Sequence, residues 1–258
     1  MMLKKASGPL KLGAVSLGGL ALFLWPFFGG SAPPAAASLS IVLGMIAVLA
    51  FVEVATRQLD SRRFAILAAI AAVDAALRLV VVIGIGGWSP IFFLILVAGY
   101  TYGPSFGFLT GATALLASAV ATGGIGPWLP YEAIACGWVG MAAGVAGLRR
   151  RSVPGRRDVL LLAGVGVITG FLYGALLDVW DWTTFYRGTP DFGFVPGLSP
   201  LVAAARFGKF YLTTSLLWDS FRAAGNAVAV LAIGAPVIAA LSRLRSRFNV
   251  EVLADPVA

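Results

Sequence analysis

The chain has 258 residues, of which 59% are hydrophobic and only 12% are charged. Because soluble domains carry about 25% charged residues, this composition predicts an integral membrane protein. Histidine is absent and there is one cysteine, which excludes histidine-based zinc motifs, histidine-dependent catalytic triads and a disulfide within the chain. The net charge is +8, and in a membrane protein the positions of the charges are more informative than their sum.

Eight apolar segments are predicted to be membrane-spanning helices. A spanning helix needs about 20 mainly apolar residues, and these runs lack the alternating pattern of β-barrel strands. The segments are 10–28, 37–56, 64–86, 90–102, 105–122, 130–148, 158–180 and 210–242. The fourth segment is short, and only Gly103-Pro104 joins it to the fifth, so these two segments could form one bent re-entrant element rather than two spans.

The basic residues follow the order of the predicted spans. Fourteen of the 19 lie before the first span or in every second connection after it: Lys4, Lys5, Lys11, Arg57, Arg62, Arg63, Arg149, Arg150, Arg151, Arg156, Arg157, Arg243, Arg245 and Arg247. The alternate connections 29–36, 87–89 and 123–129 contain none, while the last one, 181–209, has Arg187, Arg206 and Lys209, which Asp181 and Asp191 partly offset. Since basic connections stay in the cytoplasm, the pattern predicts a multi-pass protein of the cell membrane with both termini cytoplasmic.

The first span has a second interpretation as a signal peptide. It combines a basic start and an apolar stretch with a run of small residues at Ala35-Ala36-Ala37, which is typical of a cleavage site. Cleavage there would leave the orientation of the later spans unchanged.

Aromatic residues gather near the predicted outer ends of the spans. They are Trp25, Trp88, Trp128, Tyr131, Trp180, Trp182, Phe185, Tyr186, Phe192 and Phe194. An interfacial belt would occupy both faces of the membrane, but the inner connections contain almost no Trp or Tyr. The asymmetry favours an outward cluster that holds a flat ligand. The long connection 181–209 is rich in Gly, Pro and aromatic residues and is predicted to form an ordered cap or gate.

Ionisable residues inside spans are costly, so each one is a candidate for function. Asp219, Arg222 and Asn226 lie on one face of the last predicted helix, at spacings of three and four. They could hold the polar part of a ligand or form an internal salt bridge. Asp74 and Arg78 lie four residues apart on the third predicted helix, where they can pair either as a structural element or as part of a gate.

Small residues form a stripe on the third predicted helix. Ala68, Ala72 and Ala76 recur at every fourth position, and this spacing lets another helix approach closely. The chain has no phosphate-binding loop, because Phe210 follows its only Gly-Lys pair, where such a loop needs Ser or Thr. It therefore cannot hydrolyse ATP by that route.

Residues 90–147 resemble the centre of a substrate-binding S component of an energy-coupling-factor (ECF) vitamin transporter. The motifs that carry the resemblance are Gly103-Pro104 with Gly107 and Gly111, then Gly126-Pro127-Trp128, then Trp138-Val139-Gly140 with Gly144. Residues 218–228 also resemble the last helix of the long actinobacterial members. The resemblance covers about residues 63–242, which is six of the eight predicted spans.

The resemblance implies an all-α membrane protein with a six-helix S-component core at 63–248. Two extra membrane helices at 1–62 would precede this core, and a cytoplasmic tail at 249–258 would follow it. An S component is a transporter subunit, not an enzyme, and needs no cofactor of its own because two cytoplasmic ATPases use the ATP. It docks on a membrane T component, here through Ala68, Ala72 and Ala76, and no nucleic acid is involved.

The expected ligand is a vitamin or similar micronutrient bound at the outer face. The long members most resemble the cobalamin-related branch, so a corrinoid is the first candidate. Queuosine precursors, riboflavin and thiamine-like molecules fit the same family outline. The candidate substrate-binding residues are Trp88, Trp128, Tyr131, Trp138, Trp180, Trp182, Asp219, Arg222 and Asn226.

Two other classes of function are less consistent with the sequence. A membrane-embedded lipid-modifying enzyme would need convergent carboxylates for a metal, or a base, and the spacing of Asp178, Asp181 and Asp191 fits no metal motif. A secondary transporter could use Asp74 and Arg78 for proton coupling, but the inverted repeats that would support it are not evident in the sequence.

Overall fold

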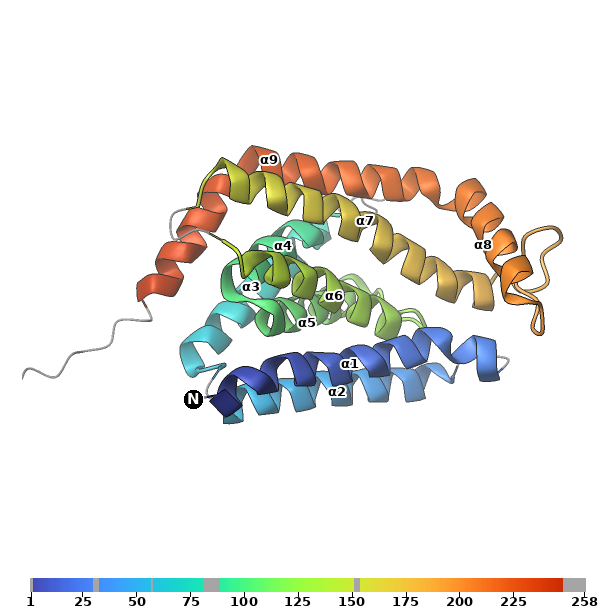
Figure 1. Cartoon of the computed structure of the whole chain (residues 1–258), viewed down its shortest axis with the longest axis horizontal. Helices are drawn as coiled ribbons and strands as arrows, with labels where there is room; N and C mark the ends of the chain where they lie inside the picture. The colour runs from blue at the N-terminus through green and yellow to red at the C-terminus, as the bar shows by residue number, and fades with distance from the viewer. Residues whose placement is uncertain (1, 30–32, 57, 81–88, 151–153, 248–258) are drawn as a thin grey trace, which may run out of the picture.

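The computed structural model describes residues 2–29, 33–56, 58–80, 89–150 and 154–247. These ranges contain nine α-helices and no strand, as predicted for an all-α membrane protein (Figure 1). The helices are α1 (Met2–Gly29), α2 (Ala35–Ala55), α3 (Ser61–Val80), α4 (Ile91–Tyr102), α5 (Pro104–Thr122), α6 (Leu129–Gly147), α7 (Arg156–Thr184), α8 (Pro200–Thr214) and α9 (Leu216–Arg247). Six of them, α1, α2, α5, α6, α7 and α9, are long and apolar enough to cross a membrane.

The helices differ from the predicted segments at two places. The predicted span 210–242 starts too early, because α8 and α9 are separate helices that meet at Ser215. The apolar residues at the end of α8 continue the hydrophobic pattern of α9 and hide this break. The fourth and fifth segments are two helices, α4 and α5, which meet at Gly103, whose φ of 105° is accessible to glycine. Helix α4 is too short to be counted among the spanning helices of the described residues.

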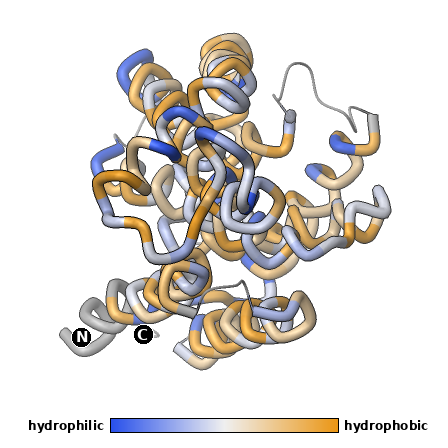
Figure 2. The backbone as a smooth tube through the Cα atoms, turned by 90° about the vertical axis from the view of Figure 1, so that its right-hand side faces the viewer, coloured by the Kyte–Doolittle hydropathy of each residue, from blue (hydrophilic) through white to orange (hydrophobic). Residues whose placement is uncertain are grey.

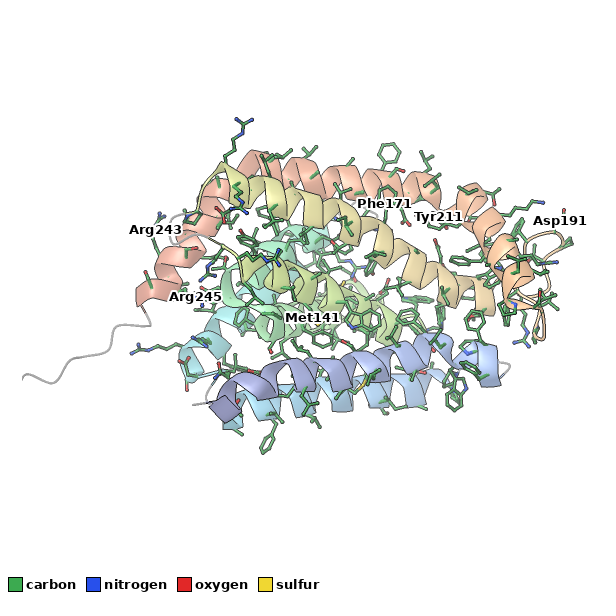
Figure 3. The ribbon with its side chains drawn as sticks, viewed as in Figure 1. Met141, Phe171, Asp191, Tyr211, Arg243 and Arg245 are labelled. Atoms are coloured by element: carbon green, nitrogen blue, oxygen red, sulfur yellow. The ribbon has the colours of Figure 1, made fainter. Side chains whose placement is uncertain are left out.

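The bundle has two distinct ends. At one end, helices α6 and α9 finish and α7 begins (Figure 1). Arg243 and Arg245 lie there, so we call it the basic end (Figure 3). At the other end, α7 finishes near Trp180 and α8 lies beside it, and we call this the aromatic end; Asp191 lies there (Figure 3). The alternation predicted from the basic connections is therefore present in the arrangement of the helices.

The short helix α4 lies at the centre of the bundle. Ten of its twelve residues are buried, the exceptions being Leu94 and Tyr102. A helix of twelve residues is about 18 Å long. The carbonyl of Thr101, at the carboxyl end of α4, accepts hydrogen bonds from Arg150 and from Arg245 of α9. These guanidinium groups satisfy the buried end of the helix and complement its dipole.

Glycines let α4, α5 and α6 approach to backbone contact. A Cβ atom added at Gly99 of α4 or at Gly107 of α5 would collide with the carbonyl of Gly140 on α6. A Cβ added at Gly144 would meet the backbone of Pro104, and one at Gly111 would meet Cys136. Close packing of this kind stabilises helices in a membrane, where dispersion replaces hydrophobic expulsion. Four of the glycines that carry the family resemblance therefore lie where the central helices touch: Gly107, Gly111, Gly140 and Gly144.

The first two helices form a layer along one side of this core (Figure 1). Lys11 of α1 pairs with Glu53 of α2 at 3.0 Å, and Trp138 of α6 donates a hydrogen bond from Nε1 to Ser16 Oγ at 3.1 Å. Phe23 adds an edge contact with Tyr131 at 5.2 Å between ring centroids. Seen from the aromatic end, hydrophobic residues run along the helices of both layers (Figure 2).

Substitution of Gly140 by Ala tests the glycine packing. The new methyl group has no space against the backbone of Gly107, so we expect a loss of stability of at least about 1–3 kcal/mol. Gly44 on α2 is the matched control, since a Cβ there meets nothing within 4 Å. Unfolding by denaturant in detergent measures both variants. Equal stability of Gly140→Ala and Gly44→Ala would contradict the packing described here.

Candidate ligand-binding site

A pocket of about 310 Å³ opens at the aromatic end between the start of α6 and the end of α7. We call it the aromatic pocket, and it is lined by Pro33, Pro127, Tyr131, Trp180, Thr183, Thr184 and Arg187. Tyr131 and Trp180 were predicted from the sequence. The Thr184 hydroxyl is buried and has no hydrogen-bond partner among the described residues, so it is available to a bound molecule.

The wall of the aromatic pocket is a set of touching rings. Trp180 lies 5.7 Å from Tyr131 and 6.4 Å from Trp128, between ring centroids, and makes an edge contact with Phe185 at 5.3 Å. Trp180 and Tyr131 are buried, while Trp128 is 37% exposed. Packed neighbours hold these rings in place. Their side chains would therefore lose little conformational entropy when a ligand binds against a flat ring face.

The connection after α7 and helix α8 form an ordered cap beside the pocket. Trp182 is 1% exposed, donates from Nε1 to the carbonyl of Phe192 at 2.6 Å, and contacts Phe194 at 5.1 Å. Arg206 of α8 donates to the carbonyl of Gly193 at 2.9 Å. The cap predicted for residues 181–209 is thus a folded unit with Trp182 in its own small core.

A polar network links the ends of α7, α8 and α9. Ser215 donates to Asp178 Oδ1 at 2.8 Å, and the Tyr211 hydroxyl donates to Asp219 Oδ2 at 2.9 Å. Arg222 forms an ion pair with Asp219, whose side chain is 2% exposed. Burial, followed by the hydrogen bond to Asp219, raises the pKa of Tyr211, so its hydroxyl stays a donor. Asp219 and Arg222, predicted to share one face of the last helix, therefore pair with each other, and Tyr211 of α8 also bonds Asp219.

Some acceptors of this region have no partner in the described chain. Asp178 Oδ2 and Asn226 Oδ1 are both buried without one, although Asn226 donates from Nδ2 to the carbonyl of Gly166 at 3.1 Å. An unpaired buried acceptor costs about 1–3 kcal/mol. A ligand that brings hydrogen-bond donors would remove that cost.

A second charged group lies between α3, α5 and α6. Arg78 donates to Ser118 Oγ at 2.8 Å, while both carboxylate oxygens of Asp74 are buried without a hydrogen-bond partner among the described residues. No ion pair between Asp74 and Arg78 is present among the described residues, and Arg78 instead bonds Ser118 of α5.

The predicted ligand-binding residues fall into several groups. Tyr131 and Trp180 line the aromatic pocket, and Trp128 packs against Trp180. Asp219 and Arg222 belong to the polar network, and Asn226 lies further along α9. Trp182 lies in the cap and Trp138 against α1. Trp88 lies outside the described residues. The sequence did not predict Thr183, Thr184, Tyr211 and Ser215, because isolated hydroxyl residues form no recognisable pattern. Thr183 and Thr184 lie one helical turn after Trp180, and this spacing was the signal that could have placed them on the same face as that ring.

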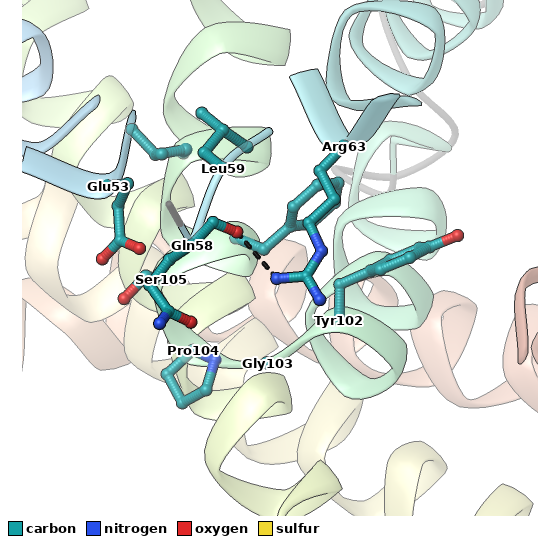
Figure 4. Close-up of a pocket in the computed structure, with 10 residues that line it drawn as sticks. Glu53, Gln58, Leu59, Arg63, Tyr102, Gly103, Pro104 and Ser105 are labelled. Atoms are coloured by element: carbon teal, nitrogen blue, oxygen red, sulfur yellow. Dashed lines mark hydrogen bonds between the residues drawn. The ribbon is translucent and has the colours of Figure 1, made fainter. Parts of the chain in front are cut away.

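Another pocket, of about 160 Å³, lies at the basic end between the α2–α3 connection and the turn from α4 to α5. Glu53, Arg63 and Tyr102 are among its lining residues (Figure 4). Arg63 donates to the carbonyl of Gln58 at 2.7 Å, and Glu53 pairs with Lys11. Its charged groups already have protein partners, so the aromatic pocket is the better candidate for ligand capture.

A protein-family model described as "ECF transporter, substrate-specific component" matches residues 62–234. The chain belongs to this family. It is therefore a membrane transporter subunit, not an enzyme, of the kind that works with a T component and ATPases. The match begins at residue 62, so helix α1 and helix α2 precede it. Searches of curated proteins and of solved structures gave no match.

The alanine stripe of this S component faces outwards. Ala68, Ala72 and Ala76 are exposed on α3, while Ile66 and Ile70 on its other face are buried in the core. The exposed face is apolar and presents small side chains, so another helix can lie close against it.

Replacing Arg222 of this S component by Gln tests the polar network. The change leaves the Asp219 carboxylate buried without its cation, which we expect to cost about 3–5 kcal/mol of unfolding free energy. The double variant Asp219→Asn, Arg222→Gln removes both charges and should recover most of that loss. Denaturant unfolding in detergent measures the three proteins. A double variant no more stable than Arg222→Gln would contradict a buried ion pair.

Proposed function

We propose that this S component captures a vitamin or related micronutrient in the aromatic pocket and delivers it with a T component and two cytoplasmic ATPases. The observation that supports this proposal is the aromatic pocket, which Tyr131 and Trp180 line at the end of the bundle opposite Arg243 and Arg245. The distribution of basic residues supports an orientation with the aromatic end outside the cell and both termini in the cytoplasm.

Capture would use stacking and a few polar contacts. The ring of Trp180 would lie against the flat part of the ligand, and the Thr184 hydroxyl would contact its polar edge. Buried acceptors such as Asp178 Oδ2 favour a ligand rich in N–H or O–H donors. ATP-driven motion of the partners would then tip the subunit in the membrane and release the ligand inside.

The size of the pocket bears on the choice of ligand. The sequence resemblance places a corrinoid first, and the peripheral amides of a corrinoid could satisfy the buried acceptors. However, pockets for drug-sized ligands have volumes of about 300–1,000 Å³, and the aromatic pocket, at about 310 Å³, is at the small end. The volume favours a molecule of the size of riboflavin, thiamine or a queuosine precursor over a whole corrinoid.

Docking to the T component would use the outward face of α3. Ala68, Ala72 and Ala76 form its exposed small-residue stripe, and the flanking side chains of Phe64 and Val73 are 55% and 53% exposed. This surface suits a helix of the partner that approaches through van der Waals contact.

Replacing Trp180 by Ala tests the capture step. Riboflavin, thiamine and cobalamin serve as probes, with binding followed by protein fluorescence and by the absorption spectrum of ligand that co-purifies. We expect one probe to bind and Trp180→Ala to weaken it about tenfold, because a stacked ring is lost. The control is Trp25→Ala on α1, whose ring is 52% exposed. Equal binding by both variants would contradict the proposed pocket.

Replacing Ala72 by Trp tests docking. The bulky ring should keep a partner helix away, so ATP-dependent uptake in cells that contain the T component and ATPases should fall by at least about tenfold. Ligand binding by the isolated variant should persist. Ala47→Trp, at an exposed position of α2, is the matched control and should transport normally. Unchanged uptake by Ala72→Trp would show that this stripe is not the docking surface.

A further inference from the structure

A separate pocket lies at the basic end, where α6 gives way to α7. It has a volume of about 620 Å³ and is lined by Tyr100, Arg149, Arg156, Arg157, Asp158, Leu160 and Leu161. All three arginines are exposed. The pocket is thus larger than the aromatic pocket and has a different character, with cations on one side and aliphatic side chains on the other.

The single carboxylate of this pocket is held by the protein. Asp158 Oδ1 accepts a hydrogen bond from the Tyr100 hydroxyl at 2.5 Å, and Oδ2 accepts one from the backbone N–H of Gly155 at 2.9 Å. Asp158 is 3% exposed, so it forms the floor of the pocket. Three arginines against this one carboxylate give the lining a net charge of +2, which suits an anion.

The position of two of the arginines strengthens this conclusion. Arg156 and Arg157 are the first two residues of α7, where the helix dipole is positive and disfavours cations. The same turn holds the carboxylate of Asp158, which caps the helix through the N–H of Gly155 and offsets one of these charges. A bound phosphate would meet the two guanidinium groups and offset the repulsion that remains between them.

An apolar strip continues from the pocket along α7. Leu161, Ile168 and Leu172 are exposed to 40%, 60% and 56%, and they lie on one helix face at spacings of seven and four. Gly164 is exposed between them, and a Cβ added there would meet nothing within 4 Å. The strip offers an acyl chain a shallow path that leads away from the arginines towards the aromatic end.

We propose that this pocket binds an anionic phospholipid from the leaflet at the basic end. The phosphate lies between Arg149, Arg156 and Arg157, and one acyl chain lies along Leu161 and Gly164 on α7. Basic pockets at the cytoplasmic face of membrane proteins recognise anionic headgroups in this way. A lipid fits better than a free anion because the exposed apolar residues of the spanning helix α7 begin next to the charged site, so one molecule can contact both.

The test uses the full chain, purified in detergent and titrated with phosphatidylglycerol or phosphatidylcholine, with bound lipid counted by native mass spectrometry. We expect phosphatidylglycerol to bind and phosphatidylcholine, which has no net charge, to bind much more weakly. The variant R156Q/R157Q should lose about tenfold in affinity for phosphatidylglycerol or more. The variant R156K/R157K keeps the charge and should retain most of the binding.

The matched control is R62Q/R243Q, which removes two exposed charges at the same end but outside the pocket and should bind phosphatidylglycerol like the unchanged protein. Leu161→Gln should weaken the binding of phosphatidylglycerol without any change of charge. This variant tests the proposal if R156Q/R157Q does not fold. Equal loss in R62Q/R243Q, or equal binding of phosphatidylcholine, would overturn the proposal. Displacement of the lipid by inorganic phosphate at the same concentration would also overturn it, by showing a small-anion site.

Discussion

Backbone contact between α4, α5 and α6 is the constraint on which the rest of the molecule depends. Gly99, Gly107 and Gly140 bring these helices so close that no side chain fits between them. In a membrane such contact supplies dispersion energy that hydrophobic expulsion cannot. It also buries α4 on nearly all sides. Because this centre is compact, the longer helices around it are left to form the ligand site and the outward surfaces.

The outer helices divide these roles by position. Helix α7 takes part in both proposed sites. Trp180, near its end, lines the aromatic pocket, and Arg156, at its start, lines the proposed lipid pocket. Helix α3 packs on the core by one face and leaves its alanine face open. Helix α1 reaches the same aromatic region through Phe23, which contacts Tyr131. The N-terminal helices therefore support the wall of the pocket as well as covering α6.

Much of this could be predicted from the sequence, for identifiable reasons. Long apolar runs define the helices, and the arginines order the two ends, because both signals are carried by composition along the chain. The break at Ser215 was missed because hydropathy is continuous across it. Trp138 was grouped with the ligand residues, yet its Nε1 bonds Ser16. The sequence shows which residue is aromatic, but only the packing of helices shows what each ring faces.

The central claim is that this chain binds the ligand but depends on partner subunits to move it. Its most direct test is uptake of the identified ligand into proteoliposomes that contain the chain alone, or the chain with a T component and two ATPases. We expect ligand binding in both preparations, with accumulation inside only when the partners and ATP are present. Accumulation by the chain alone, at the same rate with or without ATP, would contradict it.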